Sequence, residues 1–593
     1  MRRWLYLPVI LLALVLVFLL PMLARNSKAA RPNEPKLAKP EKVKASASSS
    51  SQEQLKITAV PWGPTQADMG AATRDALRSP AVLKYIRGTS YRKLSSEFIS
   101  PDDKYSATPQ PPTRYRVTIY DYTHNRTVIA EGTFGKPDSI TASLSTGQPP
   151  PSEEEFTFAE KIVARDQRFG PAIRDKSLKT YHPMPPVLYP QSETSTVERT
   201  IMVGLLPSGP GNFRNEVVGV NMTCKQLVRY ENGAPPTSLA SPEACGIASA
   251  SQGTTSNGTA GQYLVTASLG GTELWNFNVV RPSASSGNSS ERSGIELQNV
   301  KYRGKMVLKR AHVPILNVKY DADACGPYRD WQYSEGYFQT DAVGFSDVGA
   351  GFRIVKSPAT TALESGNDTG NFKGVAVYTQ GTELVLVTEL NAGWYRYIHE
   401  WRLDSDGTIR PRYGFGATAS SCVCSIHHHH VYWRFDFDIN TPDKNGVFPV
   451  VEGAWWQPPP IATEGQFYRL QGTNAWLVKN LASGDGYKIV PGNDGTAFND
   501  PYSYGKGDVW VLQYHSSGGN PTELDDPNTS TAANIDAWVN SESVVNQDIV
   551  VWYGAHFDHT DGGNGVLDVV DTHDVDILSG SHVVGPDLIP VSW

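Results

Sequence analysis

The sequence predicts a mainly β protein, in which a large two-sheet β-sandwich follows two small α+β domains and an N-terminal membrane anchor. Its 593 residues exceed one ordinary hydrophobic core, so several folded units are expected. Glycine, proline, tryptophan and tyrosine are abundant, and many short stretches alternate between apolar and polar residues, which favours strands and turns. The formal net charge of -7 argues against a nucleic-acid partner and leaves small molecules or proteins.

Residues 1–25 are predicted to be a signal anchor or a signal peptide. The apolar stretch 4–24 is long enough to span a bilayer and has no small-x-small cleavage site after it, which favours the anchor. Residues 26–54 are rich in Lys, Ala, Pro and Ser and predict a disordered stalk. Asn-x-Ser/Thr triplets, although common by chance, favour a glycosylated body in the lumen or outside the cell. The predicted location is the secretory pathway, with the protein either membrane-anchored or secreted.

The first folded unit is expected at residues 55–147. A helix-like pattern covers residues 75–87, and two alternating segments at 115–121 and 126–132 predict a strand pair. Together these patterns indicate a small α+β domain.

A Pro-rich break at residues 148–152 separates this unit from a second small α+β domain at 148–245. The acidic run 153–155 complements a helix dipole and predicts the start of a helix. From residue 246 to residue 593, strand-like segments dominate. A unit of this length is large enough for a two-sheet β-sandwich with its own buried site.

Four consecutive histidines, residues 427–430, precede the aromatic strand pattern 431–438. On a strand, residues two apart share a face, so His427 and His429 can present their imidazoles to one metal ion. Two neutral imidazoles in this arrangement form half of a copper or zinc site. A cloning tag, a solvated polar run and adventitious metal binding are the alternatives, although a tag is normally terminal.

A hairpin is predicted at residues 391–409, with its turn at 405–407. Tyr395 and Tyr397 lie on one face of its first strand. From physical chemistry alone, packed core tyrosines explain this pattern best.

Taken together, these stretches resemble the copper-containing amine oxidase family, whose pattern is Asn-Tyr-Asp/Glu-Tyr, then Trp, then Asp-Gly-Thr-Ile. The family's cofactor tyrosine, which copper and oxygen convert to topaquinone, falls on Tyr395. Its His-x-His copper ligands fall on His427 and His429, and its third ligand, after Asp-Ile-Val-x-Trp-Tyr, falls on His559. The stretch 508–514 is also similar to the family. Four ordered motifs are far more specific than any one of them alone.

The resemblance also implies a structural calcium site. Its ligands would be Asp436, Asp438 and Asp548 with the backbone oxygens of Phe437 and Ile549, and hard oxygen donors are what calcium requires. Ordinary acidic residues at strand edges are the alternative. Strand alternation places Asp436 and Asp438 on the face opposite His427 and His429.

The family's catalytic base lies downstream of a tyrosine that matches Tyr320. Direct alignment of the segment 337–341 puts Gln339 at the base position, and an amide cannot accept a proton near neutral pH. Asp341, two residues on, is therefore the predicted base, and Glu335 is the next choice.

The activity that the resemblance implies is oxidation of a small primary amine by oxygen to an aldehyde, ammonia and hydrogen peroxide, in a homodimer. Trp394 replaces the family's asparagine and Arg396 replaces an acid beside the cofactor tyrosine. These departures support an alternative, a catalytically impaired copper-binding surface protein with an adhesion or recognition role. A zinc-bound structural domain is a weaker possibility, because imidazoles alone do not select the metal.

Overall fold

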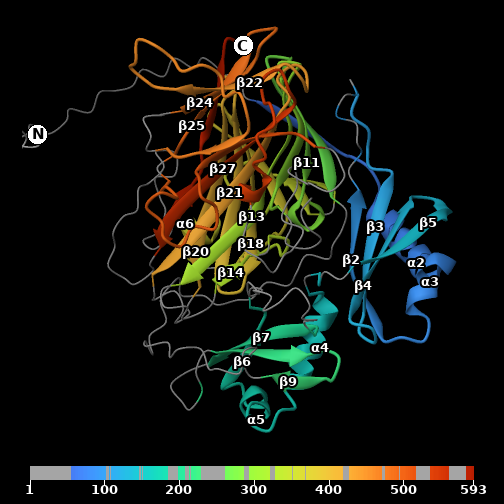
Figure 1. Cartoon of the computed structure of the whole chain (residues 1–593). Coiled ribbons are helices and arrows are strands. Elements are labelled where there is room, and N and C mark those ends of the chain that lie inside the picture. Colours follow the sequence, from blue (N-terminus) through green and yellow to red (C-terminus); the bar gives the residue numbers. More distant parts are fainter. Residues whose placement is uncertain are drawn as a thin grey trace, which may run out of the picture. The chain divides into compact units, whose positions relative to one another are not determined.

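A computed structural model defines the fold of most of the chain (Figure 1). The predicted anchor and stalk, residues 1–54, lie outside the described residues. Among the described residues, no helix is long and apolar enough to cross a membrane. The structure describes residues 55–99, 101, 104, 106, 108–145, 148–149, 151–183, 198–207, 213, 216–228, 261–285, 293–320, 327–330, 332–349, 351–366, 369–418, 426–469, 475–492, 494–515, 535–559 and 582–593.

The C-terminal part forms the predicted two-sheet β-sandwich. Within the described residues, its first sheet has ten strands, and β21 lies between β13 and β27 (Figure 1). The order is β1 (Lys56–Pro61), β10 (Gln262–Leu269), β11 (Thr272–Val280), β12 (Glu296–Tyr302), β13 (Lys305–Tyr320), β21 (His427–Phe437), β27 (Ile549–His559), β26 (Val509–Gln513) and β23 (Gly465–Phe467), with β14 (Pro327–Arg329) paired to β13.

The second sheet has eleven strands in the described part of the chain, and its centre is the hairpin of β19 and β20. The predicted turn separates these two strands and is confirmed. The order is β15 (Ser346–Gly349), β16 (Phe352–Ile354), β17 (Val375–Gln380), β18 (Glu383–Ala392), β19 (Tyr395–Asp404), β20 (Ile409–Ala417), β29 (Asp587–Val591), β25 (Gly486–Val490), β24 (Ala475–Asn480) and β22 (Asn445–Val450), with β28 (His582–Val584) paired to β20.

The core lies between the two sheets. Every residue of β21 is buried, and so is nearly every residue of β19, because both faces of these central strands are covered. Alternate residues therefore belong to different layers. Trp433 and Phe435 pack in the core between the sheets, whereas Tyr432 joins a separate apolar cluster with Trp510 and Trp552 on the other face.

The first small domain is α+β, as predicted. The capping box of Thr65 and Asp68 starts its first helix, since each residue accepts a hydrogen bond from the other's backbone N–H. Its helices pack on a four-stranded antiparallel sheet, and Val117 and Val128 lie in their shared core. The elements are α2 (Gln66–Arg78), α3 (Pro80–Ile86), β2 (Tyr91–Ile99), β3 (Arg114–Asp121), β4 (Arg126–Thr133) and β5 (Lys136–Ser145).

The second small domain repeats this plan. Its first helix begins at Glu153, where the predicted acidic turn follows the capping residue Ser152. The buried Glu155 also binds Arg199, whose Nε is 3.0 Å from its Oε1. The elements are α4 (Glu153–Val163), α5 (Gly170–Arg174), β6 (Leu178–Tyr181), β7 (Thr200–Pro207), β8 (Glu216–Asn221) and β9 (Gln226–Val228).

The predicted boundary at residue 55 needs one correction. Strand β1, at the start of the segment predicted as the first small domain, pairs antiparallel with β10 and so belongs to the sandwich. Its short alternating sequence does not distinguish one sheet edge from another, because strand pairing is set by partners far away in the chain.

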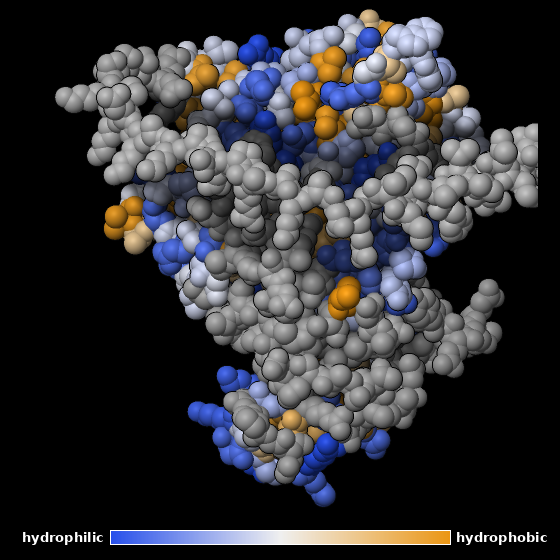
Figure 2. Space-filling model, turned by 90° about the vertical axis from the view of Figure 1, so that its left-hand side faces the viewer, coloured by the Kyte–Doolittle hydropathy of each residue, from blue (hydrophilic) through white to orange (hydrophobic). Residues whose placement is uncertain are grey.

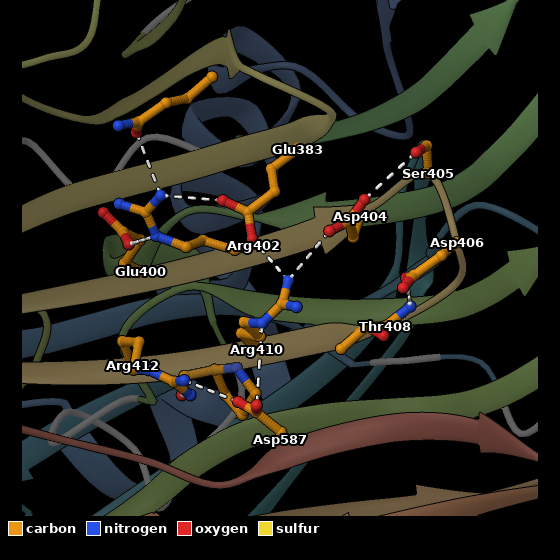
Figure 3. Close-up of polar contacts among 12 residues, drawn as sticks. Glu383, Glu400, Arg402, Asp404, Ser405, Asp406, Thr408, Arg410, Arg412 and Asp587 are labelled. Atoms are coloured by element: carbon orange, nitrogen blue, oxygen red, sulfur yellow. Dashed lines mark hydrogen bonds and ion pairs between the residues drawn. The ribbon is translucent and has the colours of Figure 1, made fainter. Parts of the chain in front are cut away.

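A network of ion pairs fixes the face of the second sheet that points away from the core (Figure 3). Arg402 binds Glu383 at 3.1 Å, and Arg410 binds the other oxygen of Glu383 at 2.6 Å. Arg412 then binds Asp587 of β29 at 2.7 Å. These groups join β18, β19, β20 and β29. They therefore stabilise the register of β19, the strand that carries Tyr395, from the face that points away from the core.

Candidate metal and cofactor site

The histidine strand β21 and the tyrosine strand β19 meet across the core of the sandwich. His427 and His429 are both buried and lie on the core face of β21. Their ring centroids are 5.1 Å apart. This separation suits two imidazoles that share one ion, since each coordinating nitrogen would lie about 2.0–2.1 Å from the metal. The predicted pairing of these two side chains on one strand face is therefore confirmed.

Tyr395 places its ring directly against this histidine pair. Its hydroxyl is hydrogen-bonded to Nε2 of His427, and its ring centroid lies 4.8 Å from that of His429. On its other side, the ring stacks on Tyr397 at 5.2 Å and with an interplanar angle of 7°. The phenol of Tyr395 thus meets a ring nitrogen of one of the two buried histidines.

His559 occupies a matching position in the neighbouring strand. It is the last residue of β27 and lies opposite His427 in the β21–β27 register. The set of three imidazoles that the family resemblance implies would suit copper or zinc.

Tyr320, which matches a tyrosine of the family pattern, belongs to the same cluster. It ends β13, and its ring stacks on His427 with the centroids 5.0 Å apart. The indole N–H of Trp394 donates to its hydroxyl at 2.7 Å. Trp394 is therefore a positioning residue, which connects the start of the tyrosine strand to the end of β13.

Arg396 does not enter this cluster. Its Nη1 donates to the backbone carbonyls of Tyr395 and Gly393, at 2.8 and 3.2 Å. The guanidinium thus supports the turn between β18 and β19, although it replaces an acidic residue of the family pattern.

The sequence prediction missed a buried carboxyl group, that of Asp330. The hydroxyl of Tyr397 donates to its Oδ2, and its Oδ1 has no hydrogen-bond partner among the described residues. Burial raises the pKa of Asp330 to about 8, although the hydrogen bond from Tyr397 opposes the shift. Asp330 follows β14, which is fixed by pairing with the end of β13. A carboxyl group with this pKa, one ring away from Tyr395, is suited to general base catalysis.

The residues that the direct alignment selected lie in other surroundings. The carboxylate of Asp341 accepts hydrogen bonds from the backbone N–H groups of Lys356 and Ser357, at 2.7 and 3.0 Å, which lower its pKa. Gln339 is exposed, and the buried Glu335 binds Arg281 with 2.9 Å between Oε1 and Nε. These environments do not suit the predicted base. Asp341 therefore stays a prediction from the resemblance, and the structure offers Asp330 as a second candidate.

The predicted calcium ligands do converge, but a lysine lies among them. Asp436, Asp438 and Asp548 each bring a carboxylate oxygen to one buried cluster. The ammonium of Lys104 forms an ion pair with Asp436 and lies 2.7 Å from Asp548 and 3.4 Å from Asp438. Its nitrogen also lies 3.5 Å from the ring centroid of Tyr514.

This ammonium fills the position that a metal ion would need. Burial lowers the pKa of Lys104, but the three carboxylates outweigh burial and raise it, so the amine stays charged. Burial also raises the pKa of Asp438 well above its ordinary value, which favours a proton on this carboxyl group. Calcium takes six to eight oxygen ligands, and the cluster does not fit it while Lys104 is present.

Comparison with known proteins shows the fold but not a family. No family model and no curated protein matches the sequence. The structure is similar to a copper-containing benzylamine oxidase from Hansenula polymorpha, with a TM-score of 0.54 and 13% identity, over 90% of this chain and 98% of that chain. An Aspergillus nidulans amine oxidase gives a TM-score of 0.51 and 13% identity, over 90% of this chain and 88% of that chain. A lysyl oxidase from Pichia pastoris gives a TM-score of 0.51 and 11% identity, over 90% of this chain and 89% of that chain.

These likenesses define the class of fold. The chain has the mainly β architecture of copper-containing amine oxidases and is a distant structural relative of them, which confirms the predicted fold class. At such low identity, the function has to be argued from the residues of this chain.

Proposed function

We propose that the chain is a copper- and quinone-dependent oxidase of small primary amines, with Tyr395 as the precursor of the quinone. The observation that carries the proposal is the position of the Tyr395 ring. It lies between the imidazoles of His427 and His429 on one side and the Tyr397–Asp330 pair on the other. No simpler structural role requires a tyrosine, two histidines and a carboxyl group at one buried point.

Copper held by His427, His429 and His559 would, with oxygen, supply the oxidation of the Tyr395 ring to a quinone that accepts electrons from the amine. Asp330 takes the proton from the carbon that bears the amino group. Tyr397 holds Oδ2 of Asp330, so Oδ1 is the oxygen that accepts this proton. The products are an aldehyde, ammonia and hydrogen peroxide.

Replacement of Tyr395 by phenylalanine is expected to abolish quinone formation and leave copper binding intact, because the three imidazoles remain. The test is to load the purified chain with copper in air and add phenylhydrazine, which forms a coloured adduct with quinones. Tyr413→Phe is the matched control, since its hydroxyl donates to Gln332, at 2.8 Å, and not to a residue of the histidine cluster among the described residues. The control should form the adduct. A coloured adduct in Tyr395→Phe, or none in the copper-loaded native chain, would contradict the assignment.

The pH dependence should follow the raised pKa of Asp330. Below about pH 8 its carboxyl group is mostly protonated and cannot accept a proton, so kcat/KM should rise as the pH passes through about 8. The rate profile of the free enzyme measures this value. An activity that falls over this range would show that another group is the base.

A catalytically impaired copper-binding relative is the second candidate. The observation that favours it is the complete burial of Tyr395, together with the packing of Trp394 against Tyr320, because an amine has to reach a covered ring. If the native chain forms the phenylhydrazine adduct but no primary amine yields peroxide, this second function is correct.

A surface role would also need an exposed contact region. Trp455 and Trp456 are 95% and 52% exposed and offer such a contact. On the face shown in Figure 2, the hydrophobic side chains of the described residues form several small groups separated by hydrophilic ones.

The proposal includes a homodimer, a body in the lumen or outside the cell, and an N-terminal anchor or signal. The Asn-x-Ser/Thr triplets and the apolar segment 4–24 support the location. The exposed Trp455 and Trp456 support self-association.

A further inference from the structure

A second histidine cluster lies on the other face of the same strand. His430 of β21 points away from the core face that carries His427 and His429, because it is an odd number of residues from both. It lies opposite His556 of β27 in the strand register, and Asp500 approaches both from the segment 494–504. Both imidazoles are buried, and the side chain of Asp500 is only 8% exposed.

The distances between the donor atoms match a tetrahedral metal site. Nδ1 of His430 lies 3.1 Å from Nδ1 of His556 and 3.3 Å from Oδ2 of Asp500. Ligands that each lie about 2.0–2.1 Å from a tetrahedral ion are separated by about 3.3–3.4 Å. The hydroxyl of Ser503 lies 3.4 Å from the same Nδ1 of His556 and donates to the carbonyl of Gly505.

The hydrogen bonds around His556 leave its inner nitrogen as a lone pair. Nε2 of His556 donates to the carbonyl of Gly507 at 3.2 Å, with the carboxylate of Asp508 nearby at 3.6 Å, so Nδ1 faces the cluster without a proton. This support of the outer ring nitrogen is typical of metal-binding histidines. Oδ2 of Asp500 has no hydrogen-bond partner among the described residues.

Without an ion, the Nδ1 atoms of His430 and His556 would face each other at 3.1 Å beside Oδ2 of Asp500, whose other oxygen accepts a hydrogen bond from the backbone N–H of Tyr502 at 2.8 Å.

We propose that His430, His556 and Asp500 bind a structural zinc ion, independent of the copper site on the opposite face of β21. Two imidazoles and one carboxylate are ligands of zinc, and the closed, buried setting suits a structural role. The ion would tie the segment 494–504 to the two strands that carry the candidate copper ligands.

The test uses the full chain with the copper ligands replaced, His427→Ala with His429→Ala, so that bound metal reports the second site alone. After dialysis with zinc, elemental analysis should find about one equivalent per chain, and cobalt in its place should give the intense visible bands of tetrahedral coordination. Adding His430→Ala should remove the zinc and these bands.

His428→Ala is the matched control, because its ring lies on the same strand face but binds Asp558 at 2.5 Å rather than the cluster. It should keep the zinc. Circular dichroism verifies that each variant is folded. The zinc content of the native chain gives a second measurement that needs no variant. The proposal would be overturned by native protein that holds no zinc, by a folded His430→Ala variant that keeps its zinc, or by copper in this site.

Discussion

Replacing Asp330 by asparagine is expected to lower kcat for amine oxidation by about 10²–10⁴-fold, the usual contribution of a general base. The amide has nearly the same shape but cannot accept a proton near neutral pH. Tyr397 can still donate a hydrogen bond to the amide oxygen, so the stacked pair with Tyr395 should persist. The phenylhydrazine adduct should therefore form as before, which separates loss of the base from loss of the cofactor.

Asp341→Asn provides the control for this variant. The carboxylate of Asp341 is half-buried and accepts two backbone hydrogen bonds, from Lys356 and Ser357, so its replacement should leave kcat unchanged. Initial rates of peroxide release with a primary amine measure both variants. A large loss in Asp341→Asn with normal turnover in Asp330→Asn would reinstate the base predicted from the sequence.

Replacing Lys104 by methionine should have the largest effect on stability. The change removes the ammonium that three buried carboxyl groups share and leaves Arg434 beside Asp436, at 3.5 Å. Removal of one partner from a buried ion pair typically costs about 3–5 kcal/mol. Urea unfolding at neutral pH gives the free energy of unfolding. The same vacancy should create a calcium site, so millimolar calcium should raise the stability of Lys104→Met and have no effect on the native chain.

Lys305→Met is the matched control, because Lys305 forms a single half-exposed pair with Asp485 at 2.9 Å. Pairs of this kind contribute about 0–1 kcal/mol, and the control should gain no response to calcium. If the native chain binds calcium tightly and loses stability in a chelator, Lys104 does not replace the ion.

Local patterns predicted the elements of the site well. Strand alternation alone placed His427 and His429 on one face and Asp436 on the other, because the period of a strand is two. The hairpin of β19 and β20 followed from its turn residues. The residues that face these strands across the core could be predicted only from the family resemblance. It implies that Tyr395 lies near the two histidines.

The features that were missed depend on long-range contacts. Lys104 is 332 residues away from Asp436 in the chain, and no local pattern marks it as their partner. Asp330 was not selected from the sequence, because no local pattern marks its carboxyl group as buried. Its burial and the hydrogen bond from Tyr397 exist only after β14 pairs with β13.

In the proposed function, the buried ring of Tyr395 becomes a quinone beside a copper ion. The most direct measurement is the mass of the peptide that contains Tyr395, after the metal-free chain is loaded with copper in air or under nitrogen. We expect the ring of Tyr395 to gain two oxygen atoms and lose two hydrogen atoms only in the sample with copper and air. An unmodified Tyr395 in a fully copper-loaded, aerated chain would contradict it.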